Sequence, residues 1–349
     1  MGKLWLCIGL FFVSSFVSGD NLLLVPQLLG EKGSSVMDSL LIAYGVVGVS
    51  VYAICTYVGA RKGLALGQAI QLYLGPWAEK VYSVIALVVA LAASGLIGGY
   101  YGGQIISEAF PVTPYLGTFI SISFFLLLAA KRPPQVVYLI NWMVPLLLLI
   151  LVMACLYDNS TTSVYLEVTA ESDTPIAFET LLLVGFNAGG VVPQLVTEMA
   201  RSLQKKPWIA IFGSIVAKFL ELIFTIFFGL FLVNLGKDNT LPILHILDGL
   251  VPLGGQWIMA VLTLGTLGLF LGPTLTLCRQ SMNKSSAFDS YTVYLLFFSG
   301  FFGISIILPE VFWGLIMIGA ICQSLFFLSL VLLILAKERP YLEGIKSQN

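Results

Sequence analysis

Residues 185–195 read Gly-Phe-Asn-Ala-Gly-Gly-Val-Val-Pro-Gln-Leu, and Glu198 follows. Near the start of the chain, residues 19–28 read Gly-Asp-Asn-Leu-Leu-Leu-Val-Pro-Gln-Leu, and Glu31 follows. Both stretches contain Val-Pro-Gln-Leu and a glutamate at the same distance after the proline. Each also places Gly, Asn and Pro inside an apolar run, where lipid cannot satisfy the backbone groups that a helix break exposes. The pattern predicts two interrupted membrane helices at corresponding positions of two halves.

The composition is that of a helical membrane protein. Hydrophobic residues make up 58% of the 349 residues and charged residues 10%, whereas soluble domains carry about 25% charged residues. A formal net charge of −1 gives no reason to expect a nucleic-acid partner. The cysteines lie in or beside apolar runs without metal-ligand spacing, so we expect them to serve packing. They are Cys7, Cys55, Cys155, Cys278 and Cys322.

Apolar windows of about 20 residues predict ten membrane-spanning helices. They lie near residues 4–29, 36–58, 81–109, 113–130, 135–156, 176–199, 207–235, 255–278, 288–308 and 310–336. Residues 63–78 are mildly amphipathic and predict a segment along the membrane surface, and residues 241–250 predict a short cap or re-entrant helix. We expect a single transmembrane domain over 1–349, with a first five-helix repeat over 1–156 and a second over 175–336.

The basic residues predict the orientation of the chain in the cell membrane. With both termini cytoplasmic, nearly all of the 17 lysines and arginines lie inside, as the positive-inside rule requires. The exceptions are Lys32 and Lys237 outside and Lys218 within a span. An alternative is a secretory signal cleaved near Gly19, but apolar character resumes at Leu22 and favours an uncleaved span.

Two five-helix halves, each with a broken first helix, resemble the amino acid–polyamine–organocation (APC) superfamily, whose fold is the LeuT type. Because five is odd, the second half starts from the opposite side, and the resemblance implies an all-α membrane protein of two inverted repeats with helices 1 and 6 broken. The resemblance covers essentially the whole chain, including the amphipathic segment and the cap. The family's Gly-Ser-Gly-like break corresponds here to residues 18–21. A methionine marks the second break in the family's metal-ion branch, and none lies near Asn187, so we expect no transition-metal substrate and no metal site.

The predicted substrate site is built from the two breaks and the glycine-rich third span. Asp20 is its most distinctive residue, since an ionisable group at mid-membrane costs on the order of 3 kcal/mol and normally pairs or faces a cavity. It could bind a coupling cation, pair with a substrate amine or carry a proton; the alternative is a hydrated carboxylate at the outer mouth. For the glycines and aromatic residues the alternative is close helix packing. The predicted substrate-binding residues are Ser18, Gly19, Asp20, Asn21, Tyr100, Gly185, Phe186, Asn187 and Gly189.

The predicted ion-coupling residues are Asp20, Thr263, Thr266, Lys218 and Glu221. Lys218 and Glu221 lie three residues apart on one helix face, either as a neutral structural pair or as part of a proton relay. Thr263 and Thr266 either bind a sodium ion or bond back to their own helix. Some proton-coupled relatives use a lysine in the fifth helix, and residues 135–156 contain none. His245, in the cap, is either a pH sensor or an ordinary interfacial residue.

The sequence contains no nucleophile–base arrangement, phosphate loop or metal cluster, so we expect neither an enzyme nor an ATP-driven pump. It predicts a secondary active transporter of a small organic solute, such as an amino acid or related amine, coupled to sodium or proton by alternating access. The expected partners are the solute, the coupling cation and the lipid bilayer, with a sodium ion as the one possible cofactor. The alternative is a receptor or complex subunit that binds a small molecule on the same fold without net transport; a channel would need a ring of charges or a filter-like repeat.

Overall fold

The computed structural model describes residues 24–32, 35–110, 112–120, 176–235 and 308–346, together with the isolated residues 4, 8, 9, 11 and 304. These described residues form helices and turns, with no strand among them. Five helices are long and apolar enough to cross a membrane: Val36–Arg61, Pro76–Ala93, Ala177–Arg201, Pro207–Phe227 and Pro309–Lys337. By length and composition, the protein is a multi-pass helical membrane protein.

The five helices correspond to the spans predicted near residues 36–58, 81–109, 176–199, 207–235 and 310–336. The end of the first predicted span is present as α2 (Val25–Lys32). The other predicted spans and the cap lie wholly or mostly outside the described residues. The count of ten helices and the inverted repeat therefore stay predictions.

The first half of the chain folds into two long helical rods. The first rod contains α3 (Ser35–Leu40), η2 (Leu41–Gly48), α4 (Val49–Thr56) and η3 (Tyr57–Arg61), in which η2 and η3 are stretches of wide π-helical turns. The second contains α6 (Pro76–Ser94), η4 (Gly95–Tyr101) and α7 (Gly102–Ala109). Between the rods lies the short helix α5 (Leu66–Leu74).

The second rod begins at Pro76, five residues before the predicted start, and the segment predicted over 63–78 is shortened to α5. The cause is local. Gly75 has a φ of +99° and ends α5, because such a dihedral is open to glycine and closed to most other residues. Pro76 then starts α6, since the missing N–H of proline is not needed in the first turn of a helix.

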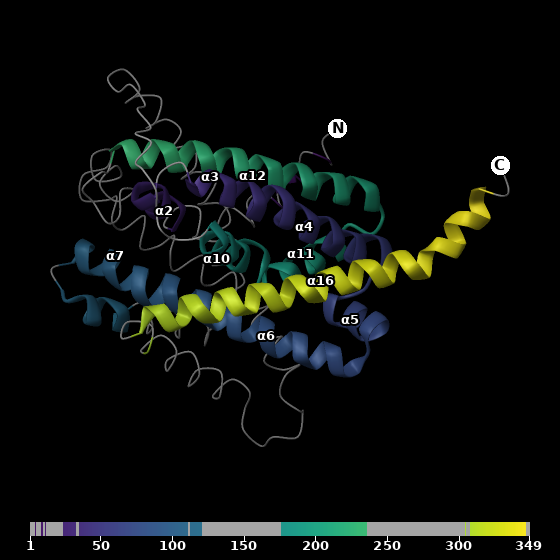
Figure 1. The fold of residues 1–349 in the computed structure, drawn as a ribbon, viewed down its shortest axis with the longest axis horizontal. Helices are drawn as coiled ribbons and strands as arrows, with labels where there is room; N and C mark the ends of the chain where they lie inside the picture. Colours follow the sequence, from purple (N-terminus) through teal and green to yellow (C-terminus); the bar gives the residue numbers. More distant parts are fainter. Residues whose placement is uncertain are drawn as a thin grey trace.

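The second half contributes a broken helix and two long ones. The broken helix consists of α10 (Ile176–Ala188) and α11 (Val192–Arg201). The long ones are α12 (Pro207–Leu235) and α16 (Pro309–Lys346). In Figure 1, α10 and α11 lie between α12 with α3 and α4 on one side and α16 with α6 on the other. Of the most apolar stretch of the broken helix, 83% is buried, against 33–50% for the other four spans, so the broken helix is the centre of the described bundle.

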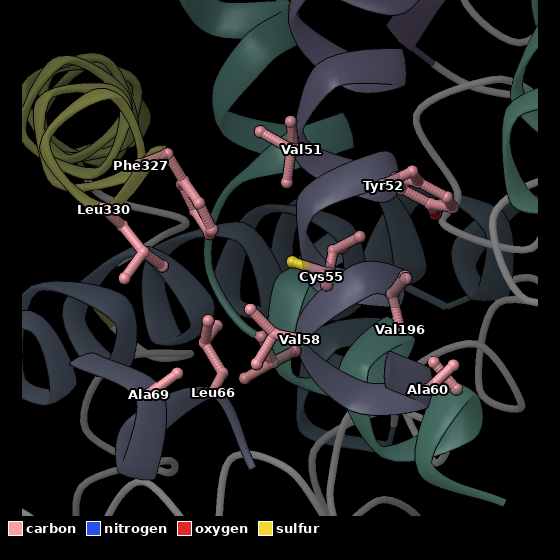
Figure 2. Packing of buried hydrophobic residues seen from close by; sticks show 14 of the residues in the cluster. Val51, Tyr52, Cys55, Val58, Ala60, Leu66, Ala69, Val196, Phe327 and Leu330 are labelled. Atoms are coloured by element: carbon pink, nitrogen blue, oxygen red, sulfur yellow. The ribbon is translucent and has the colours of Figure 1, made fainter. Parts of the chain in front are cut away.

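The buried apolar side chains fall into two clusters, one for each half of the broken helix. The first cluster joins α10 to α2, α3, η2 and the start of α16, with members such as Leu28, Val36, Tyr44, Leu182, Phe186, Phe312, Ile316 and Ala320. The second cluster joins α11 to α4, α5, α6 and the later part of α16, with members such as Tyr52, Cys55, Leu66, Ala188, Val196, Phe327 and Leu330. Figure 2 shows the second cluster, where Phe327 and Leu330 of α16 point toward Val51 and Cys55 of α4.

The boundary between the clusters crosses several helices at one level, which we call the seam. On the broken helix it passes between Phe186 of the first cluster and Ala188 of the second. On α12 it passes between Leu222 of the first and Ala217 of the second. On α16 it lies between Ala320 and Phe327. The buried polar side chains Asn187, Lys218, Glu221 and Gln323 all lie within these intervals.

The close contact between η3 and α11 generates a prediction. A Cβ added at Gly59 would overlap the backbone carbonyl of Thr197 and lie 2.9 Å from the Cβ of Ala200. We expect Gly59→Ala to lower the free energy of unfolding by about 1–3 kcal/mol, the usual cost of overpacking. Gly314→Ala is the matched control, because nothing lies within 4 Å of the added atom. Thermal unfolding of the purified protein measures both, and equal midpoints for the two variants would contradict the close packing.

Candidate functional site

The break in the central helix occupies three residues. Ordinary helix ends at Ala188, and α11 begins at Val192 after Gly189, Gly190 and Val191. Gly190 has a φ of +56°, in the left-handed region that glycine adopts without strain. The Val192 N–H donates to the Gly189 carbonyl at 3.2 Å, which closes a tight turn. The interruption predicted over 185–190 is therefore present at the end of that stretch.

The backbone groups freed by the break are bound by a side chain from another helix. The Gly190 N–H donates to Oε1 of Gln323 on α16 at 2.8 Å, and Nε2 of Gln323 donates to the Gly190 carbonyl at 3.4 Å. Gln323 is 1% exposed, so water does not compete for these groups. Its amide supplies one acceptor for the N–H and one donor for the carbonyl of this single residue.

Asn187, two residues before the turn, joins the break to α12. Its Oδ1 accepts a hydrogen bond from Nζ of Lys218, and its Nδ2 donates to the Ala43 carbonyl of η2 at 3.4 Å. Both side chains are buried. The last turn of α10 is thus held on two sides, by a charged group from α12 and by the backbone of η2.

The Lys218 ammonium has its counter-ion on the same helix. Its Nζ donates to Oε2 of Glu221 at 2.6 Å, and both side chains are at most 1% exposed. The ammonium also lies 5.0 Å from the ring centre of Tyr44 and 4.6 Å from that of Tyr52. Buried ions need both a partner and additional polar contacts, and the carboxylate, the Asn187 oxygen and two aromatic faces supply them. We call Lys218, Glu221 and Asn187 the hub.

The helix η2 approaches the hub closely at Gly48. A Cβ there would lie 2.8 Å from Cε of Lys218 and 3.3 Å from Nδ2 of Asn187. Any larger residue would push against the lysine stem or the asparagine amide. Gly48 therefore makes room for the hub.

The other predicted site residues in the described part have mainly apolar surroundings. Gly185 lies against Ile316 of α16, where a Cβ would overlap the isoleucine side chain. Phe186 is buried in the first cluster, with its ring 6.0 Å from that of Trp313 at 61°. Tyr100, in η4, is partly buried against the same cluster. Gly189 lies beside Gln323, since a Cβ there would come within 2.9 Å of its Oε1.

Some predictions fall outside the described residues. These are Ser18, Gly19, Asp20 and Asn21 of the first stretch, Thr263 and Thr266, and His245 of the cap. Their placement in the site stays a prediction. The described residues bring together Gly189, Asn187, Lys218 and Glu221, which the sequence assigned separately to substrate binding and to ion coupling.

The sequence interpretation missed Gln323, Gly48, Tyr44 and Tyr52. Gln323 could have been noticed, because an amide is conspicuous in the middle of the very apolar stretch 310–336. The other three could not, since a glycine and two tyrosines in an apolar helix are ordinary packing residues. Only the approach of η2 and α4 to Lys218 gives them a role.

Comparisons with known proteins add one similarity in structure. No protein-family model and no curated protein sequence matches the chain. Among solved structures, the chain is similar to the inward-facing conformation of Mhp1, with a TM-score of 0.48 and 13% sequence identity, over 98% of this chain and 90% of that chain. At this identity and TM-score the similarity carries no argument about function, which has to come from the chain's own residues.

The contact between Gln323 and Gly190 generates a prediction. We expect Gln323→Leu to lower the free energy of unfolding by about 1–3 kcal/mol for each backbone group left buried without a partner. Gln71→Leu is the control, because Gln71 is exposed on α5 and lies away from the break. Both variants replace a glutamine by a leucine, so the two changes differ only in their position. If thermal unfolding shows the same midpoint for both, Gln323 does not hold the break.

Proposed function

We propose that the protein is a secondary active transporter of a small organic solute, an amino acid or related amine, working by alternating access. The observation that carries the proposal is the helix break at Gly189–Val191, buried at the centre of the bundle and joined to the charged pair Lys218–Glu221. A broken helix and buried ionisable groups at mid-membrane are features of solute and ion pathways.

The two helix ends at the break have the polarity that an amino acid requires. The start of α11 carries the positive end of its helix dipole, which attracts a carboxylate. The end of α10 presents carbonyls and the negative end, which attract an amine. A solute lying across the break would meet both. The residues proposed to bind it are those predicted from the sequence: Ser18, Gly19, Asp20, Asn21, Tyr100, Gly185, Phe186, Asn187 and Gly189.

The proposed driving force is a cation gradient. Asp20, Thr263, Thr266, Lys218 and Glu221 are the proposed coupling residues, with sodium or proton as the ion. Support for the pair on α12 comes from its burial and from its bond to Asn187 beside the break. A coupling ion has to act on the element that changes conformation, and the hub touches that element directly.

Two measurements, made one after the other, test the proposed function. A thermal-shift screen against amino acids and amines, with and without sodium, identifies the solute, since a ligand at a hundred times its Kd stabilises the native state by about 2.7 kcal/mol. Counterflow of each stabilising compound is then measured in proteoliposomes. Exchange of internal for external solute is the expected result. Stabilisation without any exchange would contradict transport and would favour the receptor alternative.

We expect Asp20→Asn to reduce binding or uptake by roughly one power of ten or more, because a hydrogen bond to a charged group contributes about 1.5–3 kcal/mol. Membrane insertion should survive, since a costly charge has been removed. Asp38→Asn is the control, because Asp38 is exposed on α3. Uptake near the wild-type level in Asp20→Asn, with unchanged ion dependence, would remove Asp20 from the mechanism.

The proposed orientation places both termini in the cytoplasm, because this arrangement leaves Lys32 and Lys237 as the basic residues of the outer loops. A reporter enzyme fused after Asn349 should therefore be active on the cytoplasmic side. A reporter found on the outer side would overturn the cytoplasmic C-terminus, and with it either the orientation or the even number of spans.

A further inference from the structure

We infer that the hub is a proton-binding element, in which proton uptake by the Lys218–Glu221 pair loosens the helix break through Asn187. The inference rests on the proposed transport function and deepens it, because it selects the proton as the coupling ion. Three features carry it: the position of the pair in the span, the occupation of its oxygens and its bond to the break.

Among the charged residues of the five described spans, Lys218 and Glu221 lie deepest within their span. The others lie at or near the span ends, and all but Glu179, which is buried and pairs with Lys32, are at least partly exposed: Asp38, Arg61, Glu79, Lys80, Glu179, Glu198, Arg201, Glu310 and Lys337. Lys218 and Glu221 lie well inside their helix and are buried. Ionisable groups at such depth mark ion or proton pathways in membrane proteins.

The oxygens of the hub are already bound to a cation. The Glu221 carboxylate and the Asn187 carbonyl both receive hydrogen bonds from the Lys218 ammonium. A sodium ion at these oxygens would lie beside a positive charge in a place of low dielectric, where repulsion is strong. A proton meets no such obstacle, because it adds to a carboxylate oxygen without needing a coordination shell. The hub therefore exchanges protons in preference to metal ions.

Proton uptake changes the forces on the break. A hydronium ion transfers a proton to the Glu221 carboxylate, so one O–H bond of the hydronium breaks and one O–H bond forms on the carboxylate. The ion pair with Lys218 is lost, because the neutral carboxyl group accepts only a weaker hydrogen bond. Among the described residues, the buried ammonium then has no counter-ion, which is strongly unfavourable. It has to move toward water or other oxygens, and its hold on Asn187 weakens. Asn187 keeps its bond to Ala43, at 3.4 Å, as its remaining tie. Release of the proton to water restores the pair.

The groups facing Lys218 from the neighbouring helices are the phenols of Tyr44 on η2 and Tyr52 on α4, and the neutral amide of Asn187 on α10. Other charged groups on elements packed against α12 are placed elsewhere. Lys32 of α2 pairs with Glu179, Asp38 of α3 is exposed, and so is Arg61 of η3. Tyr57 of η3 lies beneath Lys62, and Cys55 of α4 belongs to the second cluster. Among these groups, Lys218 and Glu221 form the ionisable pair that is joined to the break through Asn187.

Hydrogen exchange of the full-length protein, with the proton as the only added ligand, tests the inference. Exchange of the backbone amides around Gly189–Val191 is followed by mass spectrometry as a function of pH and corrected for the intrinsic effect of pH. We expect the break to exchange roughly ten- to a hundredfold faster once the pair has bound a proton, the range for losing one hydrogen bond to a charged group. Glu221→Gln should exchange fast at every pH.

Two further variants, together with infrared spectra, separate the possible causes of the pH response. Glu198→Gln removes an exposed carboxylate that pairs with Arg201 on α11 and should keep the wild-type response. Asn187→Leu cuts the link and should remove the pH response of the break. In the same variant, infrared spectra should still show a carboxyl band that titrates and that is absent from Glu221→Gln. If Glu221→Gln does not fold, spectra of Glu179→Gln still show whether Glu221 titrates, because Glu179 is the other buried carboxylate among the described residues.

A wild-type break whose corrected exchange does not depend on pH overturns the inference, and so does a response that persists in Glu221→Gln. The absence of a titrating buried carboxyl band overturns it as well. The measurement needs no solute, so its failure is distinct from failure of transport. If counterflow is found but the hub does not respond to pH, the protein is a transporter coupled to another ion. If the hub responds to pH but no counterflow is found, the protein is a proton-sensing receptor.

Discussion

Backbone groups that leave a helix inside an apolar bundle need partners from the protein itself, and the arrangement of this structure depends on how Gly190 obtains them. Its N–H and carbonyl are both bound by Gln323, from a helix more than a hundred residues away in the chain. This contact fixes α16 against the broken helix at one height. The close approach of Gly185 to Ile316 acts in the same direction. The break is thus a point where helices are held together, and helix packing elsewhere has to be compatible with it.

The second consequence of the break is the seam. The peptide groups at the level where α10 stops and α11 begins require polar neighbours. Lys218 and Glu221 of α12 and Gln323 of α16 lie at that level, and the buried apolar residues on either side of it form two clusters. Val47 and Leu87 pack against both clusters, and hydrogen bonds and one charged pair join the helices at the seam. Hydrogen bonds change partners more easily than interdigitated apolar side chains rearrange.

Several elements follow directly from local sequence. The spans near residues 36–58, 176–199, 207–235 and 310–336 are helices because long apolar runs bury their backbone groups in no other way. The turn at Gly189–Gly190 is placed by two consecutive glycines followed by a proline. The start of α6 was predicted too late, because a glycine and a proline at 75–76 outweigh the apolar pattern from which the prediction was made. The sequence places Lys218 and Glu221 on one helix face, and the structure shows their side chains in contact; their role, as a structural pair or as part of a proton relay, stays a prediction.

What the sequence determined by itself is therefore the class of protein, the position of the second break and the presence of one costly charged pair, since each depends on residues close together in the chain. Only the tertiary structure decided which polar groups from different helices meet at the break. Asn187, Lys218 and Tyr44 come from three helices, and Gln323 from a fourth, so no local pattern brings them to one level. The physical reason is that a buried polar group has to find its partner wherever packing places one. The choice among possible partners is made by the bundle as a whole, through contacts such as that of Gly48 with Lys218.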